Sequence, residues 1–518
     1  MVLKSLAIVF CISTLLDMPA TAGEITLERV KAAAEKLEKK VRQEIQETGI
    51  PGIAVAVVFE DQVVLASGYG VRLAGKSEAV DASTVFQLAS VSKPLGSTVI
   101  AALVGDGIVN WDAKISDLDP GFEMQQPWVT SQITIRDMYA HRSGLPSHAG
   151  DLLEDLGFPR DHILHQLRYQ KPSTSFRTGY AYTNFGITEG AMAAAKAAGQ
   201  SWEDLCQERL YQRLGMKSTS SRYADFIANE NRAMGHVNEN GKWAHKQQRQ
   251  PDAQTPAGGV SSSVSDMAKW MQLQLAGGKF DGQQIIEEEA LQQTHQPQIM
   301  IRFKTGNGLP SFYGLGWNVS WDHEGRLRLG HSGAFLMGAA TCVALVPEEK
   351  LGVIVLTNAA PLGIPEALTS VFIDDVLYGK PTQDWLGIFK KIFAQMEAAD
   401  KAELGDFSNP PSSPSPAEKK SAYLGSYQND FFGKIHISEQ NGNLVLAAGP
   451  DQQRQQFQLK HWDRDTFTFQ PTGEFAVGTA GVTFTLGPDN LAQSVLLENL
   501  NVHGEGTFQK ISDDQSGE

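Results

Sequence analysis

Residues 86–93 read FQLASVSK, and the rest of the chain is interpreted outward from this stretch. Ser90 and Lys93 lie at positions i and i+3 where helical periodicity begins, so their side chains share one helix face. A serine hydroxyl is a weak nucleophile and needs a neighbouring group that takes its proton. Alone, the S-x-x-K pattern is weak, because roughly one or two copies arise by chance at this length. An N-cap serine and a solvated lysine explain it at least as well.

A second group of polar residues, Tyr182-Thr183-Asn184, follows a loop and precedes a segment of helical composition. A tyrosine held near a lysine can have a lowered pKa and relay protons, and an asparagine amide can bind a substrate carbonyl. On its own, the tripeptide is equally typical of an ordinary turn with a packed tyrosine. Its meaning depends on whether Tyr182 lies near Lys93.

Two tripeptides compete for a third element, Lys304-Thr305-Gly306 and His331-Ser332-Gly333. The K-T-G element of penicillin-recognising enzymes lies on a strand that edges the active site. Lys304 is followed by loop residues, whereas His331 lies between the strand-like segments RLRLG and AFLMGAATCVALV. We therefore place His331 at the site and interpret Lys304 as a loop lysine. Gly333 would let the backbone pass close to a substrate.

The chain has 518 residues, of which 42% are hydrophobic and 20% charged, with a net charge of −15. This composition excludes general disorder, a collagen-like chain and a polytopic membrane protein. The acidic balance disfavours binding to nucleic acid or to an anionic membrane surface. Three cysteines exclude a disulfide framework, and no HExxH motif is present, so we expect neither a metal nor another cofactor. Spacing alone leaves open whether Cys206 and Cys342 pair.

The N-terminus has the pattern of a secretory signal peptide over residues 1–22. Lys4 precedes an apolar run at residues 5–16, and Pro19-Ala20-Thr21-Ala22 ends in an A-x-A cleavage pattern. The run is too short to span a bilayer comfortably, and a buried N-terminal helix is the alternative interpretation. We expect an exported chain, periplasmic or secreted, with no transmembrane segment after cleavage.

The order of elements predicts an α+β fold with an antiparallel sheet flanked by helices and an inserted helical lobe. An amphipathic helix is expected at 25–48, with two strands between residues 53 and 70. Helical periodicity starts at residue 84, and the helical lobe is expected at about 105–215. The remaining elements are strands at 313–321, 325–334, 337–346 and 351–357 and a helix at 364–378.

A Pro/Ser-rich linker at 407–418 separates the larger domain, residues 23–406, from a tail at 419–518. The tail alternates polar and apolar residues and contains Asn441-Gly442, which is a hairpin signal. We expect a small all-β barrel with Trp462 and other aromatic side chains in its core. Trp270 and Trp317 are expected in the core of the larger domain.

The motifs FQLASVSK, YTN and HSG, in this order, resemble those of the serine β-lactamase and penicillin-binding-protein superfamily. The resemblance is to the class C-like branch, which includes esterases, D-aminopeptidases and D,D-peptidases. It covers roughly residues 30–380 and is strengthened by the flanking stretches HRSGLPSH (141–148), LGMKST (214–219), PAGGVSSSVSDMAKW (256–270), YGLGW (313–317) and VIVLTN (353–358). The tail resembles a domain of unknown function often appended to such hydrolases, with a lipocalin-like barrel.

This resemblance implies an exported serine hydrolase that forms an acyl-enzyme with ester or amide substrates, including D-amino-acid peptides. Ser90 would be the acylated nucleophile, and Lys93 would assist its deprotonation. Tyr182 would act as general base or proton relay. Asn184 would position the substrate carbonyl, and His331 would replace the K-T-G lysine.

The strand of the third motif would contribute further contacts. The backbone N–H groups of Ser90 and Ala334 would form the oxyanion hole. Ser332 and Gly333 would line the substrate site beside His331. An α/β-hydrolase with Ser332 as nucleophile is disfavoured, because GHSGA lacks the second required glycine and a strand follows where a helix is needed. His141 and His148 are expected to be structural hydrogen-bonding residues.

The histidine at position 331 is the main departure from the family pattern. A lysine there is a fixed charge for a substrate carboxylate, whereas a histidine with a pKa near 6.5 is largely neutral at pH 7. This favours an esterase or peptidase acting on a small molecule or short peptide, including cell-wall fragments. A β-lactamase or D,D-carboxypeptidase is the alternative, and a non-catalytic binding or sensor protein is the alternative of another class. The oligomeric state stays open.

Overall fold

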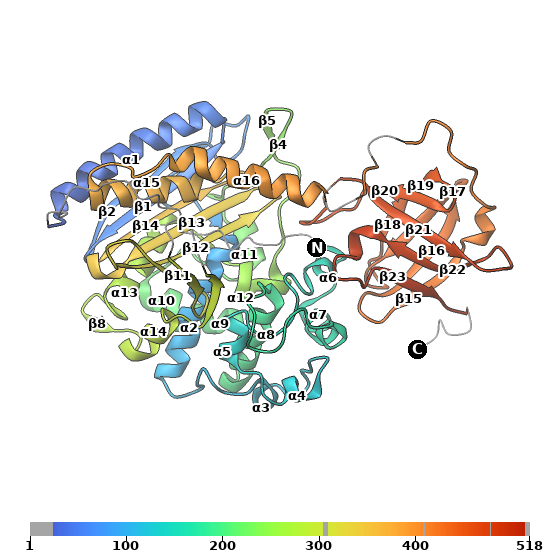
Figure 1. Ribbon diagram of the computed structural model, residues 1–518. Coiled ribbons are helices and arrows are strands. Elements are labelled where there is room, and N and C mark those ends of the chain that lie inside the picture. Colours follow the sequence, from blue (N-terminus) through green and yellow to red (C-terminus); the bar gives the residue numbers. More distant parts are fainter. Residues whose placement is uncertain (1–23, 304–308, 403–404, 408–409, 477, 513–518) are drawn as a thin grey trace.

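The computed structural model describes residues 24–303, 309–402, 405–407, 410–476 and 478–512. The signal peptide expected at residues 1–22 and the loop lysine Lys304 lie outside the described residues. Figure 1 shows a larger α/β domain and a smaller all-β lobe beside it. Within the described ranges, no helix combines the length and apolar character needed to cross a membrane.

The larger domain is built on an antiparallel sheet whose central strands are buried on both faces. Over the described residues it has eight strands in the order β2-β1-β14-β13-β12-β11-β10-β9. Every residue of β1, β13 and β14 is buried, which accounts for their continuous apolar runs. The strands are β1 (Gly52–Phe59), β2 (Gln62–Gly70), β9 (Ile299–Arg302), β10 (Ser311–Tyr313), β11 (Asn318–Trp321), β12 (Leu327–Phe335), β13 (Ala339–Val346) and β14 (Leu351–Thr357).

One face of this sheet is covered by α1 (Leu27–Thr48), α15 (Ile364–Tyr378) and α16 (Trp385–Ala402), which lie side by side in Figure 1. Helix α1 begins after Thr26, whose hydroxyl accepts a hydrogen bond from Arg29 N at 3.3 Å. The expected helices at 25–48 and 364–378 are therefore confirmed. Helix α16 is an element that the sequence patterns do not indicate.

The opposite face is covered by helices that carry or support the motif residues. Helix α13 (Val264–Leu275) packs on β1 and β14, and α2 (Ser92–Gly105) packs beside α12 (Thr255–Gly258) and α14 (Glu288–Thr294). Trp270 and Trp317 are fully buried here and stack with ring centroids 5.5 Å apart, as expected for core residues. The helical lobe contains α3 (Ile115–Leu118), α4 (Pro127–Thr130), α5 (Ile135–Tyr139), α6 (Asp151–Asp155), α7 (Arg160–Gln166), α8 (Asn184–Ala198), α9 (Trp202–Cys206) and α10 (Gln212–Leu214).

Two expectations about local structure are wrong in detail. The segment 313–321 is not one strand, because the chain turns between β10 and β11 at Gly316, which has a φ of 82°. The helical segment that starts at residue 84 first forms strand β3 (Phe86–Gln87), and α2 begins only at Ser92. Smaller elements are α11 (Tyr223–Ala228), β4 (Val237–Glu239), β5 (Lys242–Ala244), β6 (Ser261–Ser262), β7 (Lys279–Phe280) and β8 (Gln283–Gln284).

The tail forms a nearly closed barrel, as the sequence predicts. Its nine strands within the described residues follow the order β18-β17-β16-β15-β23-β22-β21-β20-β19. Tyr423, Tyr427 and Phe484 are buried together in its interior. Trp462 is an exception, because it is only half-buried and packs on Phe407 of the linker. The strands are β15 (Gly425–Asn429), β16 (Gly433–Gln440), β17 (Asn443–Ala448), β18 (Gln455–Gln458), β19 (Lys460–Asp463), β20 (Thr466–Phe469), β21 (Ala480–Leu486), β22 (Ala492–Leu497) and β23 (Thr507–Lys510).

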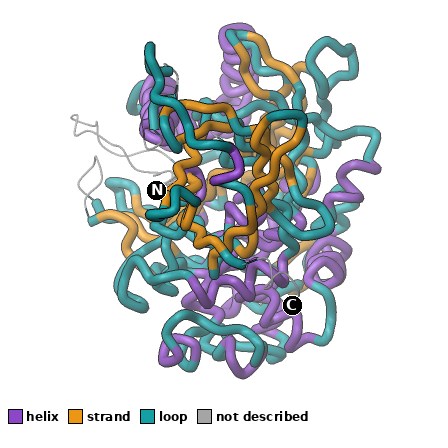
Figure 2. Tube along the Cα trace, turned by 90° about the vertical axis from the view of Figure 1, so that its right-hand side faces the viewer, coloured by secondary structure: helices purple, strands orange, loops and turns teal. Residues whose placement is uncertain are grey.

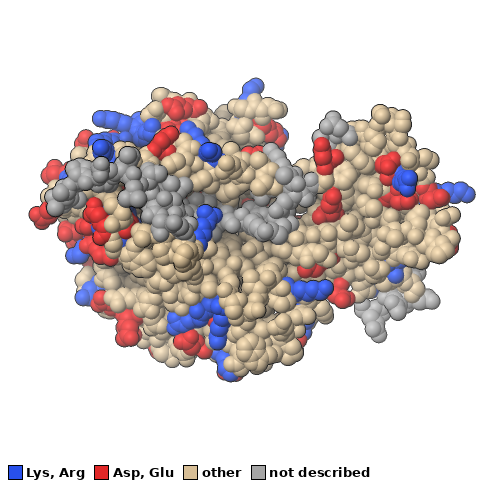
Figure 3. All heavy atoms as spheres, in the orientation of Figure 1, with Lys and Arg blue, Asp and Glu red and all other residues tan. Residues whose placement is uncertain are grey.

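The barrel docks on the part of the helical lobe that contains α6 and α7, as Figure 1 shows. Gln166 at the end of α7 donates to the backbone carbonyls of Asp430 and Phe431 in the barrel, at 3.0 and 2.8 Å. Figure 2 views the molecule from this side. In Figure 3, acidic and basic side chains are interspersed over the visible face.

Candidate active site

Ser90 lies in a tight turn between β3 and α2, where the backbone is strained. Ala89 has a φ of 47°, in the left-handed region that costs a non-glycine residue about 1–3 kcal/mol. The turn is held in place by Leu88, whose N–H donates to the carbonyl of Val260 at 2.9 Å. The carbonyl of Leu88 accepts from the Thr341 hydroxyl of β13 at 2.7 Å. The contacts of Leu88 with Val260 and with Thr341 thus fix the position of the neighbouring Ser90, whose exposed fraction is only 8%.

Lys93 is fully buried, and its amine meets three oxygen atoms. Nζ lies 3.0 Å from Ser90 Oγ and donates to Asn184 Oδ1 at 2.7 Å and to the carbonyl of Ala257 at 2.9 Å. Burial lowers the pKa of Lys93 well below its usual value, and the charge of Asp151 opposes this shift. A neutral amine has two N–H groups and one lone pair. In a neutral Lys93, the two carbonyl-type acceptors would take both N–H groups and leave the lone pair for Ser90 Oγ.

Tyr182 approaches the same hydroxyl. Its Oη donates to Ser90 Oγ at 2.7 Å, and Lys93 Nζ lies 4.5 Å from the centre of the Tyr182 ring. The structure therefore brings together the two motifs whose proximity the sequence could not decide. Burial raises the pKa of Tyr182 above its usual value, although the hydrogen bond with Ser90 opposes this. The expectation of a lowered tyrosine pKa is wrong, because desolvation is the largest influence on the Tyr182 hydroxyl and the charge of Asp151 adds to it.

Asn184 connects Lys93 to a buried carboxylate. Its Oδ1 accepts from Lys93, and its Nδ2 donates to Asp151 Oδ2 at 2.8 Å. The same carboxylate oxygen contacts His148 Nδ1 at 2.7 Å, and Asp151 is only 1% exposed. Oδ1 and one N–H of the Asn184 amide are thus engaged by protein groups, so the amide holds Lys93, and its second N–H is a donor that a substrate carbonyl could use.

Asp151 is the residue at this site that the sequence interpretation lacks. It forms no recognisable motif with Ser90 or Tyr182, and His148 is expected there only as a structural residue. The available signal is local, because Asp151 is the first residue of α6, where an acidic side chain is favoured. That signal indicates a helix start and says nothing about Lys93.

His331 lies on β12 and has both ring nitrogens engaged. Its Nδ1 donates to the carbonyl of Ser332 at 2.7 Å, which leaves Nε2 to accept from the Tyr313 hydroxyl at 2.9 Å. Burial and the nearby Lys93 lower the pKa of His331 to about 3. The histidine is therefore neutral and has no spare donor for a substrate carboxylate.

Strand β12 passes unusually close to Ser90 because residue 333 is glycine. A Cβ on Gly333 would lie 2.3 Å from the carbonyl oxygen of Leu88 and 2.9 Å from Ser90 N. The neighbouring side chain of Ser332 points away, with its hydroxyl 3.9 Å from Cys342 Sγ. Successive residues of a strand face opposite sides of the sheet, so Ser332 could line the site only through its backbone.

The remaining candidate residues, a histidine and two cysteines, are buried away from solvent. His141 is fully buried and its Nδ1 accepts from Thr183 N at 3.1 Å, which is the kind of role expected for it. Cys206 and Cys342 are both buried and free, so they do not pair. Over the ranges that the structure describes, no group of three His, Cys, Asp or Glu residues is arranged to hold a metal ion.

Comparison with known proteins identifies the family of the larger domain and a match for the tail. The family model described as Beta-lactamase matches residues 37–376, and that of a domain of unknown function (DUF3471) matches residues 409–512. Unguisins hydrolase ungD of Aspergillus violaceofuscus is 26% identical over 503 residues, covering 87% of each chain. Penicillin-binding protein 4 of Amycolatopsis lactamdurans is 27% identical, covering 63% of this chain and 84% of its own. The octameric penicillin-binding protein homologue from Pyrococcus abyssi has a similar fold, with a TM-score of 0.60 and 19% identity over 90% of this chain and 98% of its own.

Proposed function

Because the chain belongs to the beta-lactamase family, we propose that it is a serine hydrolase that forms an acyl-enzyme on Ser90. Its substrates are esters or amides, with short D-amino-acid peptides among the amides. One observation carries this proposal: the buried amine of Lys93 lies 3.0 Å from Ser90 Oγ, and Asn184 and the carbonyl of Ala257 hold it there. This arrangement suits a base that takes the serine proton.

In the acylation step, Lys93 accepts the proton from Ser90 as Oγ attacks the substrate carbonyl carbon. The new C–O bond forms a tetrahedral intermediate whose oxyanion is bound by the backbone N–H groups of Ser90 and Ala334. Collapse of the intermediate breaks the bond to the leaving alcohol or amine. The proton held by Lys93 passes to that leaving group through the Tyr182 hydroxyl, which is 2.7 Å from Ser90 Oγ.

Deacylation repeats these steps with water as the nucleophile. The water loses its proton to Lys93, directly or through Tyr182, and the acid product leaves when the proton returns to Ser90. Because burial raises the pKa of Tyr182, its hydroxyl carries protons in both directions without a persistent phenolate. Tyr182 is thus a relay, and Asn184 keeps Lys93 in place.

His331 supports the proposed substrate class. A neutral, fully hydrogen-bonded imidazole gives no charged anchor for a carboxylate, so neutral esters and amides are favoured over β-lactams and D,D-carboxypeptidase substrates. The signal-peptide pattern of residues 1–22 supports export, which would bring the enzyme to cell-wall-derived peptides.

The test is covalent labelling of the purified chain. A fluorophosphonate probe should add one label, and peptide mapping should place it on Ser90. Ser90→Ala should abolish labelling, whereas Ser332→Ala is the matched control and should retain it, because that buried serine faces away from the site. A penicillin should label far more slowly.

The alternatives give different results. Fast penicillin turnover would favour a β-lactamase, and release of a terminal D-alanine would favour a D,D-carboxypeptidase. A folded chain that no probe labels would contradict the proposal and favour a non-catalytic binding protein.

A further inference from the structure

A loop of the barrel, residues 471–476 between β20 and β21, reaches into the larger domain beside the active site. Asp155, the last residue of α6, accepts the backbone N–H groups of Glu474 at 2.9 Å and Phe475 at 2.8 Å. Gly473 permits this approach, because a Cβ there would lie 2.3 Å from Asp155 Cγ. The loop is therefore anchored through its backbone.

The side-chain carboxyl group of Glu474 holds the chain immediately after β12. It is buried and accepts the backbone N–H groups of Leu336 and Met337. Buried Arg249 lies between the domains, binds Asp155 at 3.1 Å, and places its positive charge near Glu474. Since β12 carries His331 and Gly333 past Ser90, the barrel fixes one end of a strand that forms the site.

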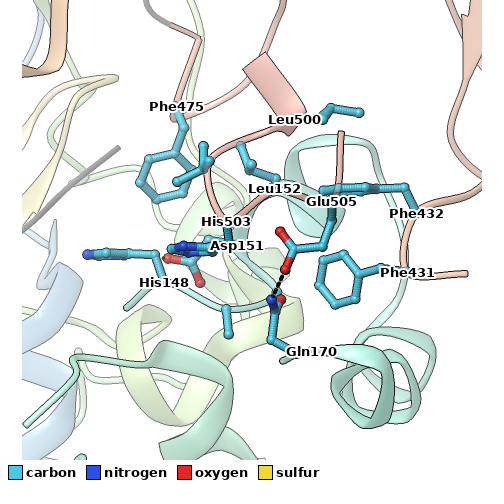
Figure 4. A pocket seen from close by; sticks show the side chains of 13 residues that line it. His148, Asp151, Leu152, Gln170, Phe431, Phe432, Phe475, Leu500, His503 and Glu505 are labelled. Atoms are coloured by element: carbon cyan, nitrogen blue, oxygen red, sulfur yellow. Dashed lines mark hydrogen bonds and ion pairs between the residues drawn. The ribbon is translucent and has the colours of Figure 1, made fainter. Parts of the chain in front are cut away.

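Phe475 contacts the other side of the site. Its ring centroid lies 5.9 Å from that of His148, and His148 lies 5.4 Å from the ring of Tyr182. Figure 4 shows Phe475 reaching from the barrel toward His148 and Asp151. A second barrel residue, His503, donates to the carbonyl of Ser147 at 2.9 Å. The barrel thus holds the short segment that presents Asp151 to Asn184.

The space around these contacts is too small for a substrate. The crevice between the domains, lined by His148, Asp151, Phe475 and their neighbours, has a volume of about 20 Å³. That is room for about one water molecule. The barrel residues that line this crevice therefore act by packing against the larger domain and do not bind a substrate there.

We propose that the C-terminal barrel completes the hydrolase active site, with Phe475 as a positioning residue. Phe475 acts through His148, which fixes Asp151 and, through Asn184, the amine of Lys93. Glu474 acts in parallel by fixing the end of β12. This inference rests on the proposed function, because it assigns the barrel a role in the reactivity of Ser90.

The test compares full-length variants by the rate at which a fluorophosphonate labels Ser90. Phe475→Ala should label about two- to tenfold more slowly than the wild type, the size expected for the loss of one aromatic contact, and should still reach full labelling. Phe475→Tyr keeps the ring and should restore the rate. Gln166→Ala is the matched control, because it removes a barrel contact made to Asp430 and Phe431 instead of one made to His148.

A second readout does not depend on activity. Hydrogen exchange of residues 147–151 should be faster in Phe475→Ala and unchanged in Gln166→Ala. An unchanged labelling rate in Phe475→Ala, or an equal loss in Gln166→Ala, would overturn the inference. Labelling of the wild type tests the proposed function, whereas the ratio between variant and wild type tests the role of the barrel, so each can fail alone.

Discussion

Replacing Asp151 with asparagine tests the buried chain of contacts behind Lys93. Asp151 is only 1% exposed and accepts from Asn184 at 2.8 Å and His148 at 2.7 Å on the same oxygen. Asparagine has nearly the same size and retains one acceptor oxygen. The substitution therefore removes the charge while leaving the packing almost unchanged.

The magnitude follows from the hydrogen bonds that lose their charge. A hydrogen bond to a charged group contributes about 1.5–3 kcal/mol and a neutral one about 0.5–1.5 kcal/mol. Losing roughly 1–2 kcal/mol of positioning at Asn184 corresponds to about a 5- to 30-fold decrease in kcat/KM. The charge of Asp151 also raises the pKa of Lys93, so its removal should move the lysine limb of the pH profile to lower pH.

The assay is kcat/KM for a chromogenic ester as a function of pH, with a thermal melt to show that the variant folds. Glu189→Gln is the matched control, because it is the same carboxyl-to-amide exchange at an equally buried position on α8, where the neighbouring charges are Asp119, Lys196 and Asp161 rather than Lys93. An unchanged kcat/KM in Asp151→Asn, or a lysine limb that moves to higher pH, would refute the reasoning.

Four further predictions concern proton transfer, the protonation of His331, the pH dependence of stability and signal-peptide cleavage. Lys93→Ala and Tyr182→Phe should each lower kcat more than tenfold in steady-state assays, as expected for proton-transfer groups, and a smaller loss would remove them from that role. His331→Asn should leave the pH dependence of kcat/KM unchanged between about pH 5 and 8, because the imidazole is already neutral in this range. If the wild-type pH profile has an inflection near the usual histidine pKa and the variant lacks it, His331 titrates and the prediction is wrong. Burial raises the pKa of Glu474 from 4.5 to about 8, so the folded state holds a proton that the unfolded chain has lost, and stability should fall as pH rises across this window. The fall is at most about 1.4 kcal/mol per pH unit, and Glu474→Gln should remove it in denaturation experiments; an identical slope in the variant would contradict this. An intact-mass measurement of the exported chain should show that it begins at Gly23. A mass that still includes residues 1–22 would argue against a cleaved signal peptide.

The parts of the fold that could be predicted depend on local patterns. The spacing of apolar residues in α1 and α15 and the continuous runs in β13 and β14 are visible within one segment. Trp462 shows the limit, because an aromatic residue in an alternating strand can face either side of a barrel, and this one faces the linker.

The active-site motifs could be found because their residue types and order are distinctive, but their protonation states could not. The pKa directions of Tyr182 and His331 are set mainly by burial, which depends on how distant segments pack. The roles of Asp151 and Phe475 could not be predicted from the sequence for the same reason. The contact between Asp155 and Phe475 N joins residues 320 positions apart on two domains, and no local pattern marks it.

The most direct test of the account is to stop turnover of an ester substrate with acid within the first cycles and weigh the protein. We expect a mass increase equal to the acyl group, located on the peptide that contains Ser90, and accumulation of that species in Tyr182→Phe if deacylation becomes slow. Hydrolysis at the wild-type rate by Ser90→Ala, or an acyl group on another residue, would contradict the central claim that Ser90 is the nucleophile.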